Sequence, residues 1–413
     1  GMSIYAGAIV FKKFFGTDVV VSIIIISIVT AIYTILGGLK AVVVTETIQT
    51  VILIFGALIV TVFCLLALPA HGITSLAQLK GAMRPDQLSM LHTNSQVGLN
   101  WYAVFLGYPI LGIWYWCTDQ TIVQRVLGAK DENHARTGAL FAGFIKILPV
   151  FSFVLPGLVC LALIAKGVIP PLPLNEAGQP DAALTYSHMI GTLLPVGLQG
   201  VVAAALMAAL MSTVSGALNS AATLFSYDLY KRWAPGTSED KLVMIGRIVT
   251  FVAIVLAVVW SPLCGRFPTV FQGINAAISY LAPPITVVFV AGVFWRRASS
   301  KASFITLITG SAVGFVVFLL DFSKLLAAFK TAHPSFGFLN FMVISFLLAC
   351  LCGAVMIVLS LAFPDEPTEQ RMALVWKSPL EPLREKGWPG LGNYKFLSAL
   401  LALTMIVLYV VFR

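Results

Sequence analysis

Two adjacent hydroxyl residues, Ser212 and Thr213, lie inside the apolar run "AAALMAALMSTVSGALNSAATLF". On a helix their hydroxyl oxygens point about 100° apart. Hydroxyl and carbonyl oxygens are the ligands that a hard cation such as sodium needs. The same run has small residues at helical spacing, which by itself favours close packing against a neighbouring helix. These small residues are Ala205, Ala209, Ser212, Gly216 and Ser220. From the spacing alone, both interpretations remain open.

A lysine stands in the middle of a second apolar run. Lys146 lies within "GALFAGFIKILPVFSFVLPG", and Pro149 and Pro156 follow it. A charged group at the centre of a membrane helix costs about 2.5–3.5 kcal/mol on insertion scales. We therefore expect Lys146 to face a partner or a water-filled cavity. Glu46 and Arg125 also belong to apolar runs, but near their ends, where snorkelling explains a charge as well as function does.

Helix-breaking residues mark two further runs. Gly107, Pro109 and Gly112 are expected to interrupt a helix over 100–125, and Pro283-Pro284 to interrupt one over 268–295. Broken membrane helices expose main-chain groups that can bind ions and solutes.

Three aromatic residues, "WYW", follow the first predicted break directly. Packing alone accounts for Trp114 and Trp116. Tyr115 has a flat face and a hydroxyl group, which suit stacking on a sugar-like or other polar solute.

The composition explains why these polar groups stand out. Of the 413 residues, 59% are hydrophobic and 10% are charged, and the mean hydropathy is +0.95. A soluble chain of this size could not cover so much apolar surface, so most of the surface must face lipid. The net charge of +9 is spread over short clusters between apolar runs. This is typical of membrane proteins and gives no reason to expect nucleic-acid binding.

Ten runs are long enough to cross a bilayer, which needs about 20 apolar residues per helix. They lie at about 18–38, 41–68, 100–125, 137–166, 190–230, 243–262, 268–295, 301–320, 338–363 and 395–412. The run 190–230 is too long for one straight span and is expected to include a lead-in and an extension. Residues 3–14 are too short to span alone and read as the tail of a helix.

Lysine and arginine are distributed unequally between the predicted loops. Sixteen of the 26 lie near residue 40 and in 125–136, 231–247, 296–301 and 364–395, against nine on the other side. Lys146, the remaining one, falls inside a span. The excess marks the first set of loops as cytoplasmic. Residues 364–394, rich in Pro, Glu and Lys, are then a cytoplasmic connector before the last helix.

Five segments, in this order, resemble the sodium/solute symporter family, and its sodium–sugar branch in particular. They are "YTILGGLKAVVVTETIQT" (33–50), "WYWCTDQTIVQRVLGAK" (114–130), "FAGFIKILPVFSFVLPG" (141–157), "MSTVSGALNSAATLFSYDLYKR" (211–232) and "SYLAPPITVVFVAGVFWRR" (279–297). Any one of them alone would be moderate support. Five in the family's order, over most of the chain, are strong support.

The resemblance implies an all-α polytopic membrane protein with the inverted five-helix-repeat fold of the leucine-transporter type. We expect about ten complete transmembrane helices, plus the tail of another, in a single transporter domain over 1–413. The motifs place the first residues in the third helix of the first repeat. The first two core helices, which in the family supply sodium and sugar ligands, are therefore expected upstream of an N-terminally truncated chain.

The resemblance also implies a sodium site on the helix of the hydroxyl pair. Ser212 and Thr213 match the hydroxyl ligands, and Ala209 matches the carbonyl ligand. Two-sodium members of the family place additional hydroxyls one turn beyond. Ser215 is present there and is the candidate ligand of a second sodium, but Gly216 has no hydroxyl. We therefore expect one sodium per cycle.

A solute site is implied on other helices. Lys146 matches the lysine that hydrogen-bonds the sugar, and Tyr115 matches the aromatic that closes the cavity toward the cytoplasm. Asn275 stands where sugar transporters usually have a Gln; it keeps the amide but is one methylene shorter. Gln272, one turn earlier, is expected to compensate, and Trp114 is a further candidate contact.

An inner gate is implied by two charged residues. Glu46 stands where an Asp is common, near the sodium exit route. We expect Glu46 and Arg125 to pair as part of this gate, together with Tyr115.

The expected function is sodium-coupled symport of a small polar solute, most directly a sugar, by alternating access in the cell membrane (the inner membrane in a Gram-negative source). Inositol, an amino acid, sialic acid or another carboxylate, and a vitamin remain open as solutes, as does a non-coupling sensor or channel of the same fold. The sequence shows no nucleophile–base arrangement, so we expect no enzyme and no cofactor besides Na⁺ as the coupling ion. The expected partners are the solute, sodium and the bilayer.

Overall fold

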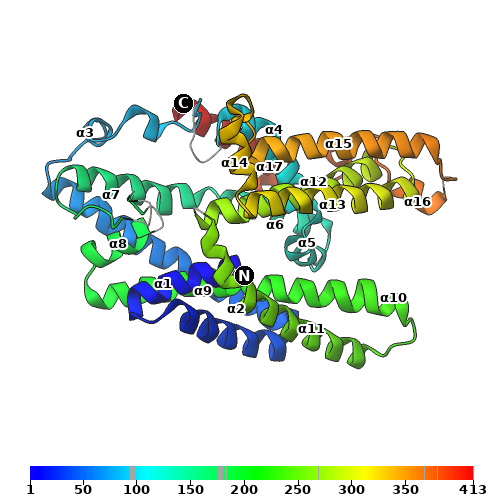
Figure 1. Ribbon diagram of the computed structural model, residues 1–413, viewed down its shortest axis with the longest axis horizontal. Coiled ribbons are helices and arrows are strands. Elements are labelled where there is room, and N and C mark those ends of the chain that lie inside the picture. The colour runs from blue at the N-terminus through cyan, green and yellow to red at the C-terminus, as the bar shows by residue number, and fades with distance from the viewer. Residues whose placement is uncertain are drawn as a thin grey trace. The chain divides into compact units, whose positions relative to one another are not determined.

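The computed structural model describes the whole chain except residues 94–98, 175–177, 179, 182–183, 268, 367, 379 and 413. In this described part the regular structure is helical (Figure 1), apart from two isolated bridges, His92 with Asn100 and Leu174 with Pro180. The predicted all-α class is confirmed.

Nine helices within the described residues are long and apolar enough to cross a membrane, and each lies on one of the ten predicted spans. They are Val19–Gly38, Lys40–Ala70, Glu132–Ala165, Val196–Trp233, Glu239–Arg266, Val270–Phe294, Ser300–Phe322, Phe341–Ala362 and Tyr394–Val411. Their outer faces carry exposed Leu, Ile, Val and Phe side chains. The last of them, α17, has only 6% of its apolar window buried, so nearly its whole surface is available to lipid.

The first two spans form one element, α2 (Val19–Ala70), with a kink inside it. Gly38 has φ 59° and ψ −166° at the kink, a conformation that strongly favours glycine. The sequence "LGGLK" therefore changes the direction of the chain between two spans without a loop.

The tenth predicted span, 100–125, is divided. α4 (Trp101–Ile113) continues into a π-helix, η2 (Trp114–Thr118), and after the extended residue Asp119 the chain forms α5 (Gln120–Leu127). The break was predicted at Gly107, Pro109 and Gly112, and this position is wrong. Gly107 stays helical and fits against α15 (Phe341–Ala362), where a Cβ atom would lie 2.7 Å from the carbonyl oxygen of Met342.

The predicted break at Pro283-Pro284 is also wrong, because α12 (Val270–Phe294) runs through both prolines. Pro284 has no N–H group to donate to the carbonyl of Tyr280 one turn earlier. Gly314 of α13 (Ser300–Phe322) approaches this carbonyl so closely that a Cβ atom would collide with its oxygen. Packing against a glycine thus shields a main-chain group that the proline leaves without its usual donor.

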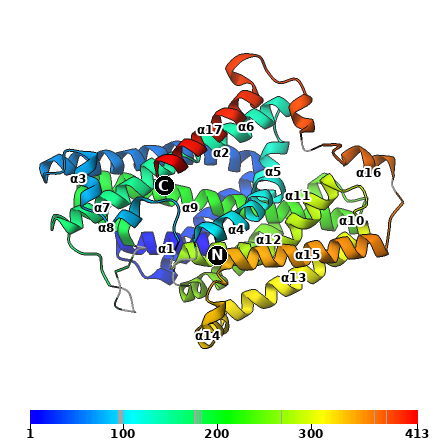
Figure 2. The same ribbon diagram turned by 90° about the horizontal axis from the view of Figure 1, so that it is seen from above.

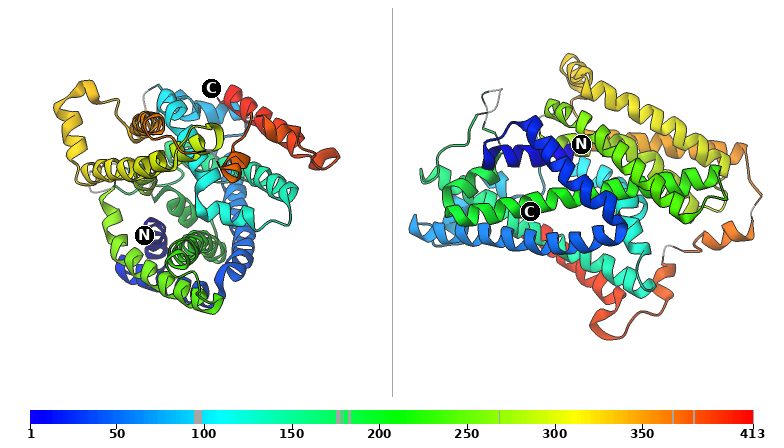
Figure 3. Two further views of the ribbon diagram at one scale, coloured as in Figure 1. Left: turned by 90° about the vertical axis from the view of Figure 1, so that its right-hand side faces the viewer. Right: turned by 90° about the horizontal axis from the view of Figure 1, so that it is seen from below.

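The chain divides into two compact units, and each is described by itself. The first contains Gly1–Ser89 and Phe141–Val270. In it α1 (Met2–Phe15) and α9 (Val196–Thr223) lie alongside α2, as Figures 1 and 3 show. A Cβ atom on Gly56 of α2 would lie 2.6 Å from the Cβ of Ala205 on α9, so the two helices approach closely at small residues.

Two apolar cores hold the first unit together. One joins α1, α2, α9 and α11 (Glu239–Trp260) through residues such as Ile23, Ile26 and Leu218. The other joins the second half of α2 to α7 (Leu155–Ala165) and α8 (Thr185–Leu193). The lead-in that was expected before the long span 190–230 is α8. The expected extension is the π-helix η5 (Leu224–Tyr230) and the short helix α10 (Lys231–Trp233).

The second unit contains Met90–Leu140 and Phe271–Arg413. Its core joins α4, α12 and α15 around the fully buried ring of Tyr280. The hydroxyl group of Thr286 on α12 donates to the carbonyl oxygen of Ile110 on α4 at 3.1 Å. In Figure 2, α13 and α15 run alongside each other.

The segment after α15 is held at two places within this second unit. Its first part contains α16 (Glu369–Leu374) and contacts the turn between α12 and α13. Its later part contacts the first turns of α6 (Glu132–Ile145), where Arg136 forms an ion pair with Glu385 and the Thr137 hydroxyl donates to the Gly392 carbonyl at 3.4 Å. The predicted connector 364–394 is therefore anchored by specific contacts at both ends.

Candidate functional site

The predicted sodium ligands on α9 lie together. The hydroxyl groups of Ser212 and Thr213 both donate to the carbonyl oxygen of Ala209, at 2.8 and 3.2 Å. The Ser215 hydroxyl donates to the carbonyl of Ser212 at 3.0 Å, and Ser215 is fully buried. Each hydroxyl oxygen keeps lone pairs for a cation when its hydrogen is donated elsewhere. One turn of α9 thus gathers oxygen atoms of the kind that sodium binds.

A tyrosine of α2 extends this polar cluster. The Tyr33 hydroxyl group donates to the carbonyl oxygen of Met211, the residue before Ser212, at 3.0 Å. It also lies within electrostatic range of the side chains of Ser215, Gln49 and Glu46. Glu46, predicted to lie near the sodium exit route, is therefore a neighbour of the tyrosine that contacts the predicted sodium helix.

Gln49 adds an unusual feature to the same neighbourhood. Its side-chain carbonyl oxygen is buried and, within the described part of the chain, accepts no hydrogen bond. A buried acceptor without a donor is unfavourable unless an ordered water or a ligand satisfies it. The residues here fit a cation: hydroxyl oxygens, main-chain carbonyls, an amide oxygen and a carboxylate. The motif "TETIQT" already contained Glu46 and Gln49 one helical turn apart, which is the signal that sequence reasoning did not use for Gln49.

The small residues of α9 also serve packing, as the alternative reading of the sequence predicted. Ala205, Gly216 and Ser220 are buried, and Ala205 meets Gly56 of α2. In contrast, Thr213 is exposed and Ser212 is half-buried. The packed small residues and the two hydroxyls predicted to bind sodium thus differ in burial along one helix.

Lys146 lies at a turn that interrupts the helix of its span. α6 ends at Ile145, and a turn at Lys146 leads into the π-helix η3 (Val150–Val154). The main-chain N–H of Lys146 still bonds to the Ala142 carbonyl at 2.9 Å, and the side chain is exposed on the surface of its unit. π-Helical turns are frequent at functional sites, because they re-aim side chains.

Tyr115 and Trp114 belong to the second unit, on the π-helix η2. Trp114 packs against the core of α4, α12 and α15, so it has a structural role, as the packing interpretation predicted. Tyr115 is half-buried, and its ring meets the ring of Trp116 edge-on at 5.4 Å.

Asp119, one residue beyond the π-helix, accepts from the N–H of Thr121 at 2.9 Å. Its role in the apolar run is to cap α5.

The remaining predicted contacts also belong to the second unit. Asn275 donates from its amide nitrogen to the Phe271 carbonyl of its own helix at 2.9 Å, and Gln272 is half-buried one turn earlier on α12. Arg125 donates to the Thr121 carbonyl on α5. Asn275 thus lies on the helix that packs against Trp114, whereas the predicted pair of Glu46 and Arg125 has one member on each unit. That pair stays a prediction.

A chain with nine long apolar helices in its described part is a multi-pass membrane protein. The model of the sodium:solute symporter family matches residues 2–310, and the chain belongs to that family. This confirms the resemblance to the sodium/solute symporter family.

Three relatives show its range of similarity. A sodium/mannose cotransporter of Bos taurus is 34% identical over 404 residues, covering 91% of this chain and 66% of the relative. The human sodium/myo-inositol cotransporter 2 is 36% identical over 342 residues, which cover 78% of this chain and 50% of the relative. The human sodium/glucose cotransporter 4 is 32% identical over 406 residues, which cover 92% of this chain and 59% of the relative. The chain therefore spans half to two thirds of the length of the relatives it matches.

A solved structure shares the fold. It is the substrate-bound, outward-open state of a Na⁺-coupled sialic acid symporter, with a TM-score of 0.68 and 21% identity, covering 88% of this chain and 71% of that chain. The predicted leucine-transporter-type fold is confirmed by this likeness.

Proposed function

We propose that the protein carries out sodium-coupled symport of a small polar solute across the cell membrane, by alternating access. Sodium entering down its gradient supplies about 1.4 kcal/mol per tenfold concentration difference. The membrane potential adds about 2.3 kcal/mol per charge per 100 mV. Coupling needs only that sodium and solute favour the same conformations of the transporter.

The observation that carries this proposal is the contact of two hydroxyl groups, on Ser212 and Thr213, with one carbonyl oxygen, on Ala209. We propose these three oxygens as ligands of the transported sodium ion, with one sodium per cycle. The hydroxyl oxygens would bind sodium through their free lone pairs.

If the transporter instead binds two sodium ions, Ser215 is the proposed ligand of the second. Its support is the position of its hydroxyl near Tyr33, which also lies close to Glu46 and Gln49. The carboxylate of Glu46 would offset the charge of an ion there. A second ion would appear as a sigmoidal sodium dependence of transport, whereas a hyperbolic dependence supports the single site.

For the solute we propose a sugar or a closely related polyol. The named relatives transport mannose, myo-inositol and glucose, to judge by their names. Tyr115 offers a ring face for stacking, Lys146 offers hydrogen-bond donors, and Asn275, Gln272 and Trp114 complete the proposed contacts. An acidic solute such as sialic acid would use Lys146 as a charge partner.

We also propose that Glu46 and Arg125 pair in the inner gate with Tyr115. Exchanging the charges, Glu46→Arg with Arg125→Glu, should then restore at least part of the transport that either single change abolishes. If the double variant stays as inactive as both single variants while reaching the membrane normally, the pair is not part of the gate.

Transport by the full-length protein in proteoliposomes tests the proposal. Accumulation of labelled mannose, myo-inositol, glucose and sialic acid is measured with an inward sodium gradient and with choline in its place. We expect one solute class to accumulate above its external concentration only with sodium. Binding without accumulation would instead identify a sensor, and accumulation unaffected by choline would overturn sodium coupling.

A further inference from the structure

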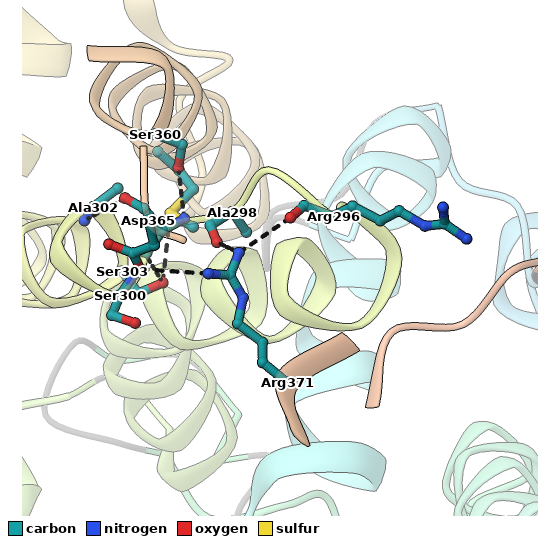
Figure 4. Close-up of polar contacts among 10 residues, drawn as sticks. Arg296, Ala298, Ser300, Ala302, Ser303, Ser360, Asp365 and Arg371 are labelled. Atoms are coloured by element: carbon teal, nitrogen blue, oxygen red, sulfur yellow. Dashed lines mark hydrogen bonds and ion pairs between the residues drawn. The ribbon is translucent and has the colours of Figure 1, made fainter. Parts of the chain in front are cut away.

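The turn between α12 and α13 is clasped by the segment that follows α15. Figure 4 shows the guanidinium group of Arg371, on α16, directed at this turn. It donates to the carbonyl oxygens of Arg296, at 3.1 Å, and Ala298. It also forms an ion pair with Asp365 at 3.4 Å. We call this arrangement the Arg371 clasp.

The acidic residue of the clasp is already satisfied. The Asp365 carboxylate accepts from the main-chain N–H of Ser300, at the start of α13, and from Arg371. These bonds hold the pKa of Asp365 below its ordinary value, with the Ser300 hydrogen bond as the main cause. Asp365 is therefore ionised and internally neutralised at physiological pH.

Beside the clasp lies a cavity of about 430 Å³ with a net basic lining. The residues that line it are Arg296, Arg297, Ser360, Leu361, Pro364, Asp365 and Met372. Both arginines are exposed, and across the described ranges neither guanidinium group has a carboxylate partner. In Figure 4 the Arg296 side chain extends away from Arg371, although its main-chain carbonyl binds that residue.

The cavity lies where apolar helices end. α12 ends at Phe294, α13 begins at Ser300, and α15 ends at Ala362, and all three are candidate membrane spans. Their ends therefore lie at the level of lipid headgroups. The lining joins two unpaired arginines to the apolar side chains of Leu361, Pro364 and Met372.

We propose that this cavity binds a phosphate group at the membrane interface, with Arg296 and Arg297 as its ligands. The shared chemistry is that of an anionic phospholipid headgroup or a free phosphate. Guanidinium groups bind phosphate oxygens through paired N–H donors, and basic cavities at the ends of membrane helices attract anionic headgroups. The apolar part of the lining suits the glycerol and upper acyl region of a lipid. This site does not depend on the transport proposed above.

Binding to the intact protein tests the site. The full chain in detergent is titrated with phosphatidylglycerol, phosphatidylcholine or inorganic phosphate, and binding is followed by native mass spectrometry. We expect phosphatidylglycerol to bind more tightly than phosphatidylcholine. In the variant Arg296→Gln with Arg297→Gln, we expect its affinity to fall about 10- to 30-fold, or about three- to fivefold per arginine.

Two control variants make the result specific. Lys241→Gln with Arg247→Gln removes the same charge from α11 and should change the affinity less than about twofold. Arg296→Lys with Arg297→Lys keeps the charge and should retain more affinity than the glutamine variant, which separates phosphate binding from a folding defect. Inorganic phosphate that binds with the same arginine dependence, and displaces the lipid, would assign the site to a soluble phosphate. Equal affinity for both lipids, or unchanged binding in the glutamine variant, overturns the proposal.

Discussion

The hydroxyl group of Tyr33 donates to the main-chain carbonyl oxygen of Met211 at 3.0 Å, across 178 positions of the sequence. This bond joins the first half of α2 to the turn of α9 that begins with Ser212. Met211 directly precedes Ser212, so the bond ties the part of α9 that carries the proposed sodium ligands to α2. Tyr33 is therefore a positioning residue of the proposed ion site.

Tyr33→Phe removes this hydrogen bond and keeps the ring. A hydrogen bond of this kind contributes about 1 kcal/mol, so we expect the sodium concentration for half-maximal transport to rise about fivefold. Sodium titrations of solute uptake by the full-length protein measure the change. Tyr227→Phe is the matched control, because its hydroxyl donates to Glu239, at the exposed end of the same unit. A sodium midpoint equal to that of the wild-type protein in Tyr33→Phe would count against the positioning role.

Gly107→Ala should destabilise the second unit. The added Cβ atom would lie 2.7 Å from the Met342 carbonyl oxygen and 2.9 Å from its Cβ, so α4 and α15 must separate. Overpacking of this kind typically costs about 1–3 kcal/mol, which outweighs the gain of about 1 kcal/mol in helix propensity.

The thermal midpoint of the solubilised protein measures this effect. Gly112→Ala is the control, because it adds the same group to the same helix at a position with no atom within 4 Å. We expect Gly112→Ala to match or exceed the stability of the wild-type protein and Gly107→Ala to fall below it. Equal midpoints for the two variants would contradict the close packing of α4 on α15.

The Arg371 clasp should open in acid. The pKa of Asp365 lies below its ordinary value of 3.8 in the folded protein, chiefly because the Ser300 N–H binds the carboxylate. A lowered pKa means that this contribution to stability is complete above pH 3.8 and is lost as the pH falls through the folded-state value. At neutral pH, Asp365→Asn should mimic the acid state.

Hydrogen exchange of the Ser300 amide reports the clasp directly. We expect faster exchange in Asp365→Asn at neutral pH, and an acid-induced rise in the wild-type protein once the known pH dependence of exchange is subtracted. Glu369→Gln removes an exposed carboxylate on the same segment and should leave the exchange rate unchanged. Identical protection in both variants would show that Asp365 does not hold the turn.

Much of the fold could be predicted, because lipid imposes a simple rule on sequence. About 20 apolar residues are needed per span, and the nine spans found among the described residues follow that pattern. Breaks within helices could not be placed in the same way. Pro283 and Pro284 stay within α12, where Gly314 of α13 packs over the carbonyl of Tyr280, and no local pattern in the sequence indicates this packing.

In the candidate site, too, contacts within one helix could be predicted from the sequence, and contacts between distant helices could not. Ser212 and Thr213 were paired from their spacing, and Ala209 was added from the family resemblance. All three lie on one helical turn, so the hydrogen bonds among them are local to α9, and their role as sodium ligands remains a proposal. The contact between Tyr33 and Met211 depends on the packing of two distant helices, and nothing in the spacing indicates it. The solute contacts on α12 and the π-helix η2 came from family resemblance, and their roles remain proposals.

The most direct test of the central claim is sodium binding to the full-length protein with alanine at both Ser212 and Thr213. Equilibrium binding of ²²Na⁺ is measured for this double variant and for a control, Thr223→Ala. The control also removes a hydroxyl group from α9, but this hydroxyl donates to the Asn219 carbonyl. We predict that the double variant loses saturable sodium binding in the concentration range that drives uptake, while Thr223→Ala keeps it. Saturable binding of wild-type affinity in the double variant would contradict the assignment of these two hydroxyls as the sodium site.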